Sequence, residues 1–274
     1  MGGAARAVRG AAALRRTLAA LAVALLVAVP ALANDDDAID PDRPDVTFSP
    51  NAVGKGRVQL ETGMFYRRTR QAAAAAERRI SAEATLRVGV TENLEVRLDG
   101  EPIVRVWNDV RDTDVGEISV GLKYRFLEAP DGVWWPTLGL YSFVKPPLAQ
   151  APISSGETDA GLILLASFEL PADFTLEVNA GAVLVGQNRP SGHLVQARAA
   201  ASLSRQIVDR LAGFVDMGYL SRGERDGRDA LAMQAGVVWR VMRDLALDAA
   251  VSASLLGALP DYGVRAGVSV RFGR

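Results

Sequence analysis

Residues 80–99 read Ile80-Ser-Ala-Glu-Ala-Thr-Leu-Arg-Val-Gly-Val90, then Thr91-Glu92-Asn93, then Leu94-Glu-Val-Arg-Leu-Asp99. In both outer segments the even-numbered residues are apolar and the odd-numbered residues are polar or small, the period-two pattern of a β-strand with one apolar face. The short central turn joins the two strands into an antiparallel hairpin. Strands of about a dozen residues are roughly twice as long as those of a soluble sheet, which favours a membrane-spanning barrel.

This hairpin pattern recurs to the end of the chain. Counted by parity, the chain contains twelve strands, and an even number is what a single-chain bacterial barrel requires. The sequence therefore predicts an all-β fold, a transmembrane antiparallel up-and-down β-barrel. Pro102 lies inside the third strand, where proline removes a hydrogen-bond donor, so a bulge is expected there. The predicted strands cover residues 57–67, 80–90, 94–106, 115–126, 134–145, 159–170, 174–184, 194–204, 211–220, 230–241, 245–255 and 262–272.

Aromatic residues on the apolar parity gather near both predicted ends of the strands. A spanning barrel carries aromatic belts at both membrane interfaces, whereas a soluble two-sheet sandwich, the alternative fold, gives no reason for such belts. Short and longer connections alternate, as periplasmic turns and external loops do, so both chain termini are expected on the periplasmic side. The belt residues are Phe126, Trp134, Phe168, Phe174, Trp239 and Phe272 near the periplasmic ends, and Tyr66, Tyr219 and Tyr262 near the outer ends.

Three segments are expected along the chain. Residues 1–33 resemble an export signal, with four arginines, an apolar run and the small-residue site Ala31-Leu32-Ala33. The apolar run is shorter than the roughly 20 residues of a membrane-spanning helix, so a retained anchor is the less favoured alternative. Residues 34–56 form an acidic, proline-rich periplasmic leader, which is either a solvated tail or a segment docked against the barrel. Residues 57–274 form the outer-membrane barrel.

The composition excludes several classes of function. The formal charge is −1, and loss of the four arginines in residues 1–33 takes it to −5, so nucleic acid is not an expected partner. The chain has no cysteine and one histidine, His193, and we assign no metal and no cofactor. A hydrolase in the barrel wall is the rival enzyme class. A loop histidine beside Ser191 and Gly192 is a weak candidate base, and no catalytic residue is assigned.

The leader carries a recognisable motif. Residues 42–50 read Asp42-Arg-Pro-Asp-Val-Thr-Phe-Ser-Pro50 and are followed by Val53, Gly56, Gln59, Glu61 and Gly63. This segment resembles the leader and first strand of the outer-membrane barrel family described as putative MetA pathway of phenol degradation. The resemblance implies an outer-membrane location and a transporter-like role in the uptake of hydrophobic or aromatic compounds. It implies no catalytic residues.

The polar face of the strands carries nearly balanced charge and is expected to line the lumen. It forms either an ion-pair lattice that fills a narrow lumen or a polar path whose charges select a solute. The hairpin register predicts Arg87 opposite Arg97 and Glu83 opposite Glu101, and such like-charged pairs need partners elsewhere. The lumen-lining candidates are Glu83, Arg87, Glu95, Arg97, Asp99, Glu101, Glu117, Lys123, Arg125, Arg198, Asp216 and Gln234.

The next strand adds Lys123 and Arg125 to the periplasmic end of this arc, which leaves the arc basic. We therefore hypothesise that the acidic leader docks there as a partial plug, through Asp42, Arg43 and Asp45.

The predicted function is an outer-membrane channel or transporter for a small solute, hydrophobic or aromatic by resemblance. A structural or surface-interaction barrel with a closed lumen is the alternative. The expected partners are outer-membrane lipid, the unidentified solute, and the outer-membrane insertion machinery, which would recognise the C-terminal strand Tyr262 to Phe272.

Overall fold

The computed structural model describes residues 38–70, 76–108, 111–130, 132–150, 153–188, 190–257 and 259–273. The predicted export signal, residues 1–33, and residues 34–37 of the leader lie outside these ranges. Within them, no helix is long and apolar enough to cross a membrane. The strands are β1 (Val58–Thr69), β2 (Glu77–Gly89), β3 (Leu94–Trp107), β4 (Arg111–Asp114), β5 (Ile118–Leu127), β6 (Thr137–Lys145), β7 (Asp159–Leu170), β8 (Phe174–Gln187), β9 (Gly192–Val208), β10 (Leu211–Leu220), β11 (Ala230–Met242), β12 (Leu245–Leu256) and β13 (Tyr262–Phe272), and one 3₁₀ turn, η1 (Pro171–Asp173), joins β7 to β8.

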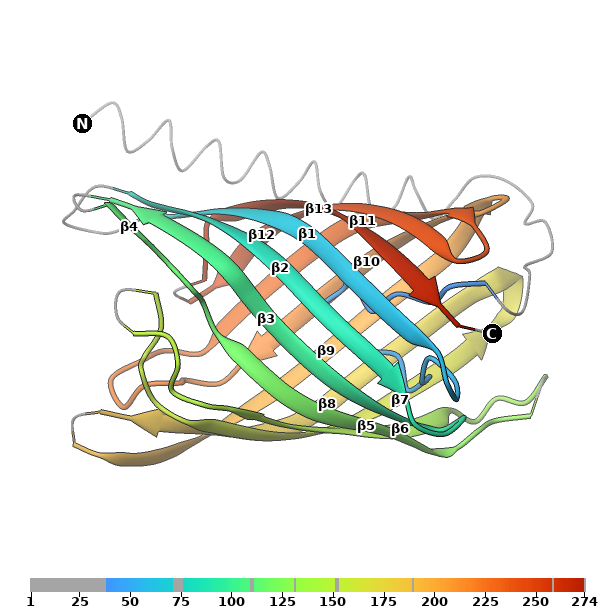
Figure 1. Cartoon of the computed structure of the whole chain (residues 1–274), viewed down its shortest axis with the longest axis horizontal. Helices are drawn as coiled ribbons and strands as arrows, with labels where there is room; N and C mark the ends of the chain where they lie inside the picture. The colour runs from blue at the N-terminus through green and yellow to red at the C-terminus, as the bar shows by residue number, and fades with distance from the viewer. Residues whose placement is uncertain are drawn as a thin grey trace.

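The strands form one closed antiparallel barrel (Figure 1). Successive strands pair with each other, and β1 pairs with β13 to close the ring. The short β4 and the longer β5 pair with successive parts of β3, residues 104–107 and 94–100. They are therefore two parts of one wall strand, interrupted at residues 115–117. The thirteen segments thus build twelve wall strands, which confirms the predicted up-and-down barrel.

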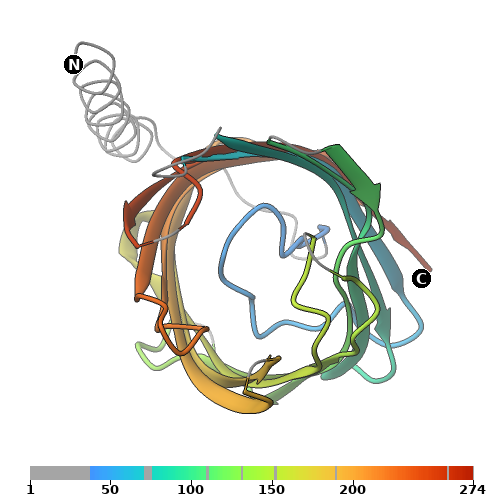
Figure 2. The same cartoon turned by 90° about the vertical axis from the view of Figure 1, so that its left-hand side faces the viewer.

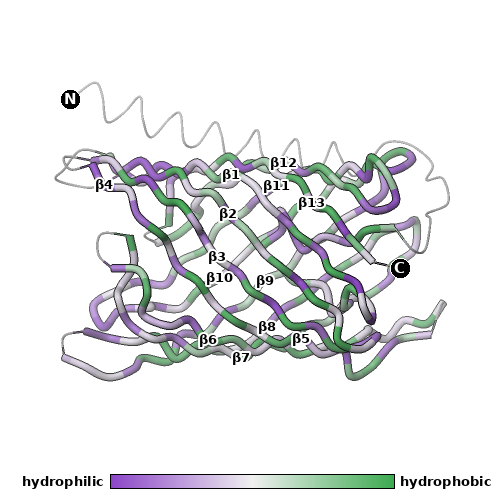
Figure 3. Tube along the Cα trace, viewed as in Figure 1, coloured by the Kyte–Doolittle hydropathy of each residue, from purple (hydrophilic) through white to green (hydrophobic). Residues whose placement is uncertain are grey.

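The barrel is polar inside and apolar outside, the reverse of a soluble protein. On the odd parity of β2 and β3, Arg87 and Glu95 are 1% and 0% exposed. On the even parity, Leu86 and Leu98 are 37% and 45% exposed. The alternation follows the strands around the whole wall (Figure 3). The outward apolar side chains match a lipid environment, and the inward charges have to be satisfied within the lumen.

The register of the opening hairpin is confirmed only in part. Arg87 lies directly opposite Arg97, as predicted. The predicted pair of Glu83 and Glu101 is wrong, because the register shifts between Ala82 and Ala84. The shift lies opposite Pro102 and confirms the expected irregularity at that proline. Beyond this shift, the even-numbered residues of β3 face the lumen in place of the odd-numbered ones.

The aromatic residues lie where a membrane barrel places them. At the end predicted to be periplasmic, where β1 begins and β13 ends, Phe126, Trp239 and Phe272 are each about half exposed, and Trp134 is exposed in the turn before β6. Near the other end, the rings of Tyr66 and Tyr262 lie 6.2 Å apart. The apolar wall between the two belts is consistent with the height of a bilayer core.

Two segments that are not strands occupy the lumen, as the view down the barrel shows (Figure 2). The first is the leader, here residues 38–56, which enters at the end where β1 begins and β13 ends. The second is the loop between β6 and β7, which begins at Pro146 and Pro147. Its Ala149 and Ile153 pack against Val104 and Val106 on the inner face of β3, so the lumen is narrowed from both ends.

Candidate functional site

The leader runs through the lumen as an irregular loop whose backbone groups bond to wall side chains. The amides of Asp42 and Arg43 donate to Glu61 at 3.3 and 3.1 Å. Further along, the amide of Val46 donates to Asp216 at 3.1 Å and that of Val53 to Glu95 at 2.9 Å. Because the leader forms no strand of its own, these polar wall residues supply the partners that its backbone requires.

Several wall glycines make room for the leader. Gly63 and Gly267 face each other across β1 and β13, and the guanidinium of Arg43 lies against both. A Cβ at Gly267 would lie 2.8 Å from Nε of Arg43, and one at Gly139 would lie 3.0 Å from Pro50. The absence of a side chain at these positions therefore allows the close approach of the leader.

On one side of the lumen the leader meets a group of buried cations. We call Arg87, Arg97 and Lys123, on β2, β3 and β5, the basic wall. Asp42 forms ion pairs with all three, at 3.5 Å to Arg87, 3.0 Å to Lys123 and a short contact to Arg97. Glu95 pairs with the same cations, at 2.9 Å to Arg87 and at 3.4 Å to Arg97 and to Lys123.

The carboxylate of Asp42 is ionised in this setting. Burial alone would raise its pKa, but the positive charges of Arg87, Lys123 and Arg97 outweigh burial and hold the pKa of Asp42 well below its usual range. Asp42 also accepts the amide of Ser49 at 3.2 Å. It therefore ties the two arms of the leader together while it pairs with the wall.

Arg43 is positively charged and pairs with carboxylates on other strands of the barrel. Its guanidinium bonds Glu83 on β2 at 2.6 Å and Asp248 on β12 at 3.5 Å. The next residue, Pro44, accepts from Gln234 at 2.7 Å and from Arg265 at 3.2 Å. The leader is thus bonded to β2, β11, β12 and β13 within two consecutive residues.

Across the lumen the leader meets carboxylates in place of cations. We call Glu177 on β8 and Asp216 on β10, with Ser202 between them on β9, the acidic wall. Asp45 accepts from Ser202 at 3.1 Å, Thr47 donates to Glu177 at 2.8 Å, and Val46 donates to Asp216. All of these donors are neutral. Burial, followed by the charges of Asp216 and Glu177, raises the pKa of Asp45 well above its usual range.

Aromatic side chains join the two walls. Phe48 packs on Tyr141 of β6 with ring centroids 5.0 Å apart, and Tyr141 stacks on Phe143 at 5.5 Å. The guanidinium of Arg97 lies 5.0 Å from the ring of Phe48 and 5.3 Å from that of Tyr141. These rings form a continuous aromatic cluster inside the barrel, flanked by a cation; Tyr141 is buried, and Phe48 and Phe143 are partly buried against it.

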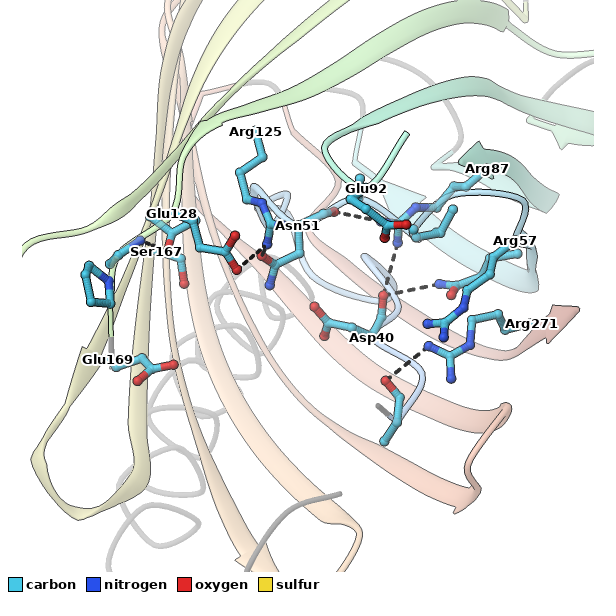
Figure 4. A pocket seen from close by; sticks show the side chains of 18 of the residues that line it. Asp40, Asn51, Arg57, Arg87, Glu92, Arg125, Glu128, Ser167, Glu169 and Arg271 are labelled. Carbon is cyan, nitrogen blue, oxygen red and sulfur yellow. Dashed lines mark hydrogen bonds and ion pairs between the residues drawn. The ribbon is translucent and has the colours of Figure 1, made fainter. Parts of the chain in front are cut away.

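A polar cavity of about 370 Å³ lies at the end where β1 begins and β13 ends, between the leader and the wall (Figure 4). Asp40 and Asn51 of the leader form one side of it. Arg125 reaches into it and bonds Asn51 at 3.3 Å and Glu128 at 3.1 Å. Around the rim lie further charges of both signs, namely Arg57, Glu92, Glu169 and Arg271.

The structure brings most of the predicted lumen residues into ion pairs or hydrogen bonds. Asp99 bonds Arg97, Thr85 and Tyr141. Glu117 bonds Lys145 and Ser154, and Gln234 bonds Asp216. Two further candidates lie apart from the leader. Glu101 bonds Arg67 and Arg79, and Arg198 donates to Gln196, with its guanidinium 6.0 Å from the ring of Phe143.

Several residues of the site were not singled out from the sequence. Tyr141 and Phe143 stand on the lumen parity of β6, and this mismatch between parity and polarity was a usable signal. Ser202 gives no such signal, because its role depends on where the leader lies. His193, the one candidate base, is exposed at the start of β9. The described residues include no group of three His, Cys, Asp or Glu placed to hold a metal ion.

Comparison with known proteins supports the fold. The COG4313 outer membrane channel from Pseudomonas putida F1 matches with a TM-score of 0.66 at 14% identity, over 85% of this chain and 100% of that one. The NanC porin matches with a TM-score of 0.53 at 14% identity, over 77% of this chain and 98% of that one. The KdgM porin in complex with disordered oligogalacturonate matches with a TM-score of 0.50 at 7% identity, over 79% of this chain and 99% of that one. At these identities the likeness shows a shared fold. No curated protein matches.

The family described as "Putative MetA-pathway of phenol degradation" matches residues 41–272. The match runs from the start of the docked leader to the last residue of β13, so it includes both the barrel and the segment inside it. The chain therefore belongs to this family of outer-membrane β-barrel proteins.

Proposed function

We propose that the protein is an outer-membrane channel for a small solute, and that its own leader sets the width of the pore. The observation that carries this proposal is the leader held inside a closed barrel by buried ion pairs, with Asp42 joined to Arg87, Arg97 and Lys123. A segment that only stabilised the wall would gain little by crossing the lumen. A segment that constricts a pore has to lie there.

The aromatic surface in the lumen supports an aromatic solute. Phe48 and Phe143, which stay partly exposed on either side of the buried Tyr141, place aromatic rings beside Arg97, and flat apolar molecules pack favourably on such rings. The proposed role involves passage or binding without covalent chemistry. The proposed location is the outer membrane, reached by export through the predicted signal in residues 1–33.

A closed structural barrel is the second candidate, and one observation favours it. Arg87, Arg97, Lys123 and Glu95 are each at most 2% exposed, so this part of the lumen is filled by side chains. A lumen filled along its whole length would pass neither ions nor solute.

Single-channel recording of the mature protein, residues 34–274, in a planar bilayer separates the two candidates. Discrete conductance steps are the expected result. Solute passage is then followed by vesicle swelling with phenol and with a sugar of similar size, and faster swelling with phenol is expected. Correctly folded protein that inserts but conducts no ions and passes neither solute would contradict the channel and favour the structural barrel.

A further inference from the structure

The carboxylates of the acidic wall and of Asp45 converge on one serine. Ser202 lies directly opposite Glu177 in the β8–β9 ladder and directly opposite Asp216 in the β9–β10 ladder. Directly opposed residues have Cβ atoms about 4.5–5.5 Å apart, and all three side chains point into the lumen. Asp45 of the leader accepts the hydroxyl of this same Ser202 at 3.1 Å. Three carboxyl groups therefore surround one hydroxyl.

No cation among the described residues bonds to this group. The donors to the three carboxyl groups are Ser202, Thr47, Gln234 and the amide of Val46. The basic side chains whose charges reach the group bond other partners. Lys123, whose charge acts on Glu177, donates to Asp42 and to the carbonyl of Ser49. Arg265 on β13 donates to the carbonyl of Pro44 and lies over the ring of Phe65, and Arg43 pairs with Glu83 and Asp248.

Two oxygens of the group are also left without a donor. The Oδ1 atoms of Asp45 and of Asp216 are both buried and accept no hydrogen bond from the described residues. Asp216 as a whole is only 1% exposed. A buried carboxylate oxygen without a donor is costly, and a proton on either carboxyl group would provide the missing donor. Closely spaced carboxyl groups in such a site do not all ionise together.

We propose that Asp45, Glu177 and Asp216 form a proton-binding site that holds the leader against β8, β9 and β10 when protonated and loosens it when the site ionises. The inference rests on the proposed function, because it makes the width of the same constriction depend on pH. The part of the leader that responds is Asp45 to Phe48. The part held by Asp42 on the basic wall does not respond over the same range.

The direction of the pH dependence follows from the environment of Asp45. Burial and the charges of Asp216 and Glu177 raise its pKa, and the more distant Asp40 adds to this rise. A carboxyl group whose pKa is raised in the docked state stabilises docking at low pH. The stabilisation is lost as the pH rises through the docked-state pKa. Residues 45–48 of the leader therefore dock more strongly on the acidic wall at low pH than at high pH.

Amide hydrogen exchange measured residue by residue in the refolded protein tests this proposal. The protection factor, the ratio of intrinsic to observed exchange rate, reports local opening at each amide. The amides of Val46 and Phe48 donate to Asp216 and Asn179 on this side of the lumen, whereas those of Arg43 and Val53 donate to Glu61 and Glu95 near the basic wall. The second pair is an internal control.

As the pH rises, the protection factors of Val46 and Phe48 are expected to fall by up to about tenfold per pH unit for each proton released on opening. Those of Arg43 and Val53 should stay level. Asp45→Asn and, separately, Glu177→Gln remove one ionisable group each and should flatten the dependence. Level protection at Val46 and Phe48 in the parent, or an equal fall in both variants, would overturn the proposal. The result does not depend on conductance, so failure of the channel function would be seen separately.

Discussion

The two sides of the lumen hold the same leader by opposite means. On the basic wall, Asp42 lies among Arg87, Arg97 and Lys123, and charge pairs with charge. On the acidic wall, Asp45 lies beside Asp216 and Glu177 and bonds only neutral donors. The two aspartates are three residues apart in the leader. Their difference shows that the surroundings, more than the residue type, decide whether an ionised buried carboxyl group stabilises or destabilises docking of the leader.

The two sides of the lumen should differ in how readily they release the leader. Breaking a buried ion pair leaves charges without partners and is strongly unfavourable. Separating carboxylates that repel each other is favourable once they ionise. The basic wall is therefore expected to act as the fixed anchor of the leader, and the acidic wall as the side that releases first.

The largest expected effect is at the anchor. Asp42→Asn removes one carboxylate from three buried cations and should lower the free energy of leader opening by about 3–5 kcal/mol. Amide exchange at Arg43 and Val53 measures the change, and protection there should drop by at least about 100-fold. The matched control is Asp40→Asn. The Asp40 side chain is half exposed and lies 3.9 Å from Arg240, so the change should be within about 1 kcal/mol. Equal effects of the two variants would contradict the anchor.

A smaller effect is expected at the aromatic contact between the walls. Phe48→Ala removes the ring that packs on Tyr141 and lies beside Arg97, which should cost about 1–3 kcal/mol of leader opening free energy. Phe48→Leu keeps apolar volume but not the ring, and it should recover part of that loss. If Leu and Ala behave alike, ring stacking does not hold the leader.

On the acidic wall the sign of the effect should reverse. Asp45→Asn removes a carboxyl group that neighbouring carboxylates disfavour, so at neutral pH it should strengthen leader docking by about 1 kcal/mol, the equivalent of roughly one pKa unit. Protection of the Val46 amide measures the gain. Weaker docking in this variant would mean that the charge of Asp45 is favourable where it lies.

The smallest expected effect is a flat pH profile at the basic wall. The cations hold the pKa of Asp42 below its usual range, so the stabilisation is complete above the ordinary carboxyl pKa and is lost only as the pH falls through the lower docked-state value. Between about pH 5 and about pH 8, the Arg43 amide should therefore keep a constant protection factor. A steady change across this range would show that Asp42 titrates there.

Parity and turn spacing were sufficient to predict the barrel. Apolar residues alternate without interruption through β7, β10 and β13, and the bounds of these strands match the predicted segments. The predicted register across β2 and β3 was correct as far as Gly100 and wrong beyond Pro102. A bulge there changes which residues oppose each other, and the sequence pattern does not give the size of that shift.

The site was less predictable than the fold. The acidic leader and the basic arc suggested an attraction, and the structure places Asp42 on that arc. Asp45, equally acidic, lies against carboxylates, which charge complementarity alone would not place there. Its position follows from chain connectivity, because the bonds of Asp42 and Arg43 fix where residue 45 can reach. Wall glycines such as Gly267 lie where the leader passes close to the wall. They could not be used to predict its path, because a glycine in a strand does not show which segment packs against it.

The central claim is that the docked leader narrows a pore, and the most direct test compares single-channel conductance with and without residues 34–50 under identical conditions. β-sheet content and heat-modifiable migration confirm that the shortened barrel is folded, and Asp42→Asn provides an intact chain with a weakened anchor. The account predicts a larger conductance step for the shortened chain, with frequent visits to that level by Asp42→Asn. Equal conductance in all three proteins would contradict it.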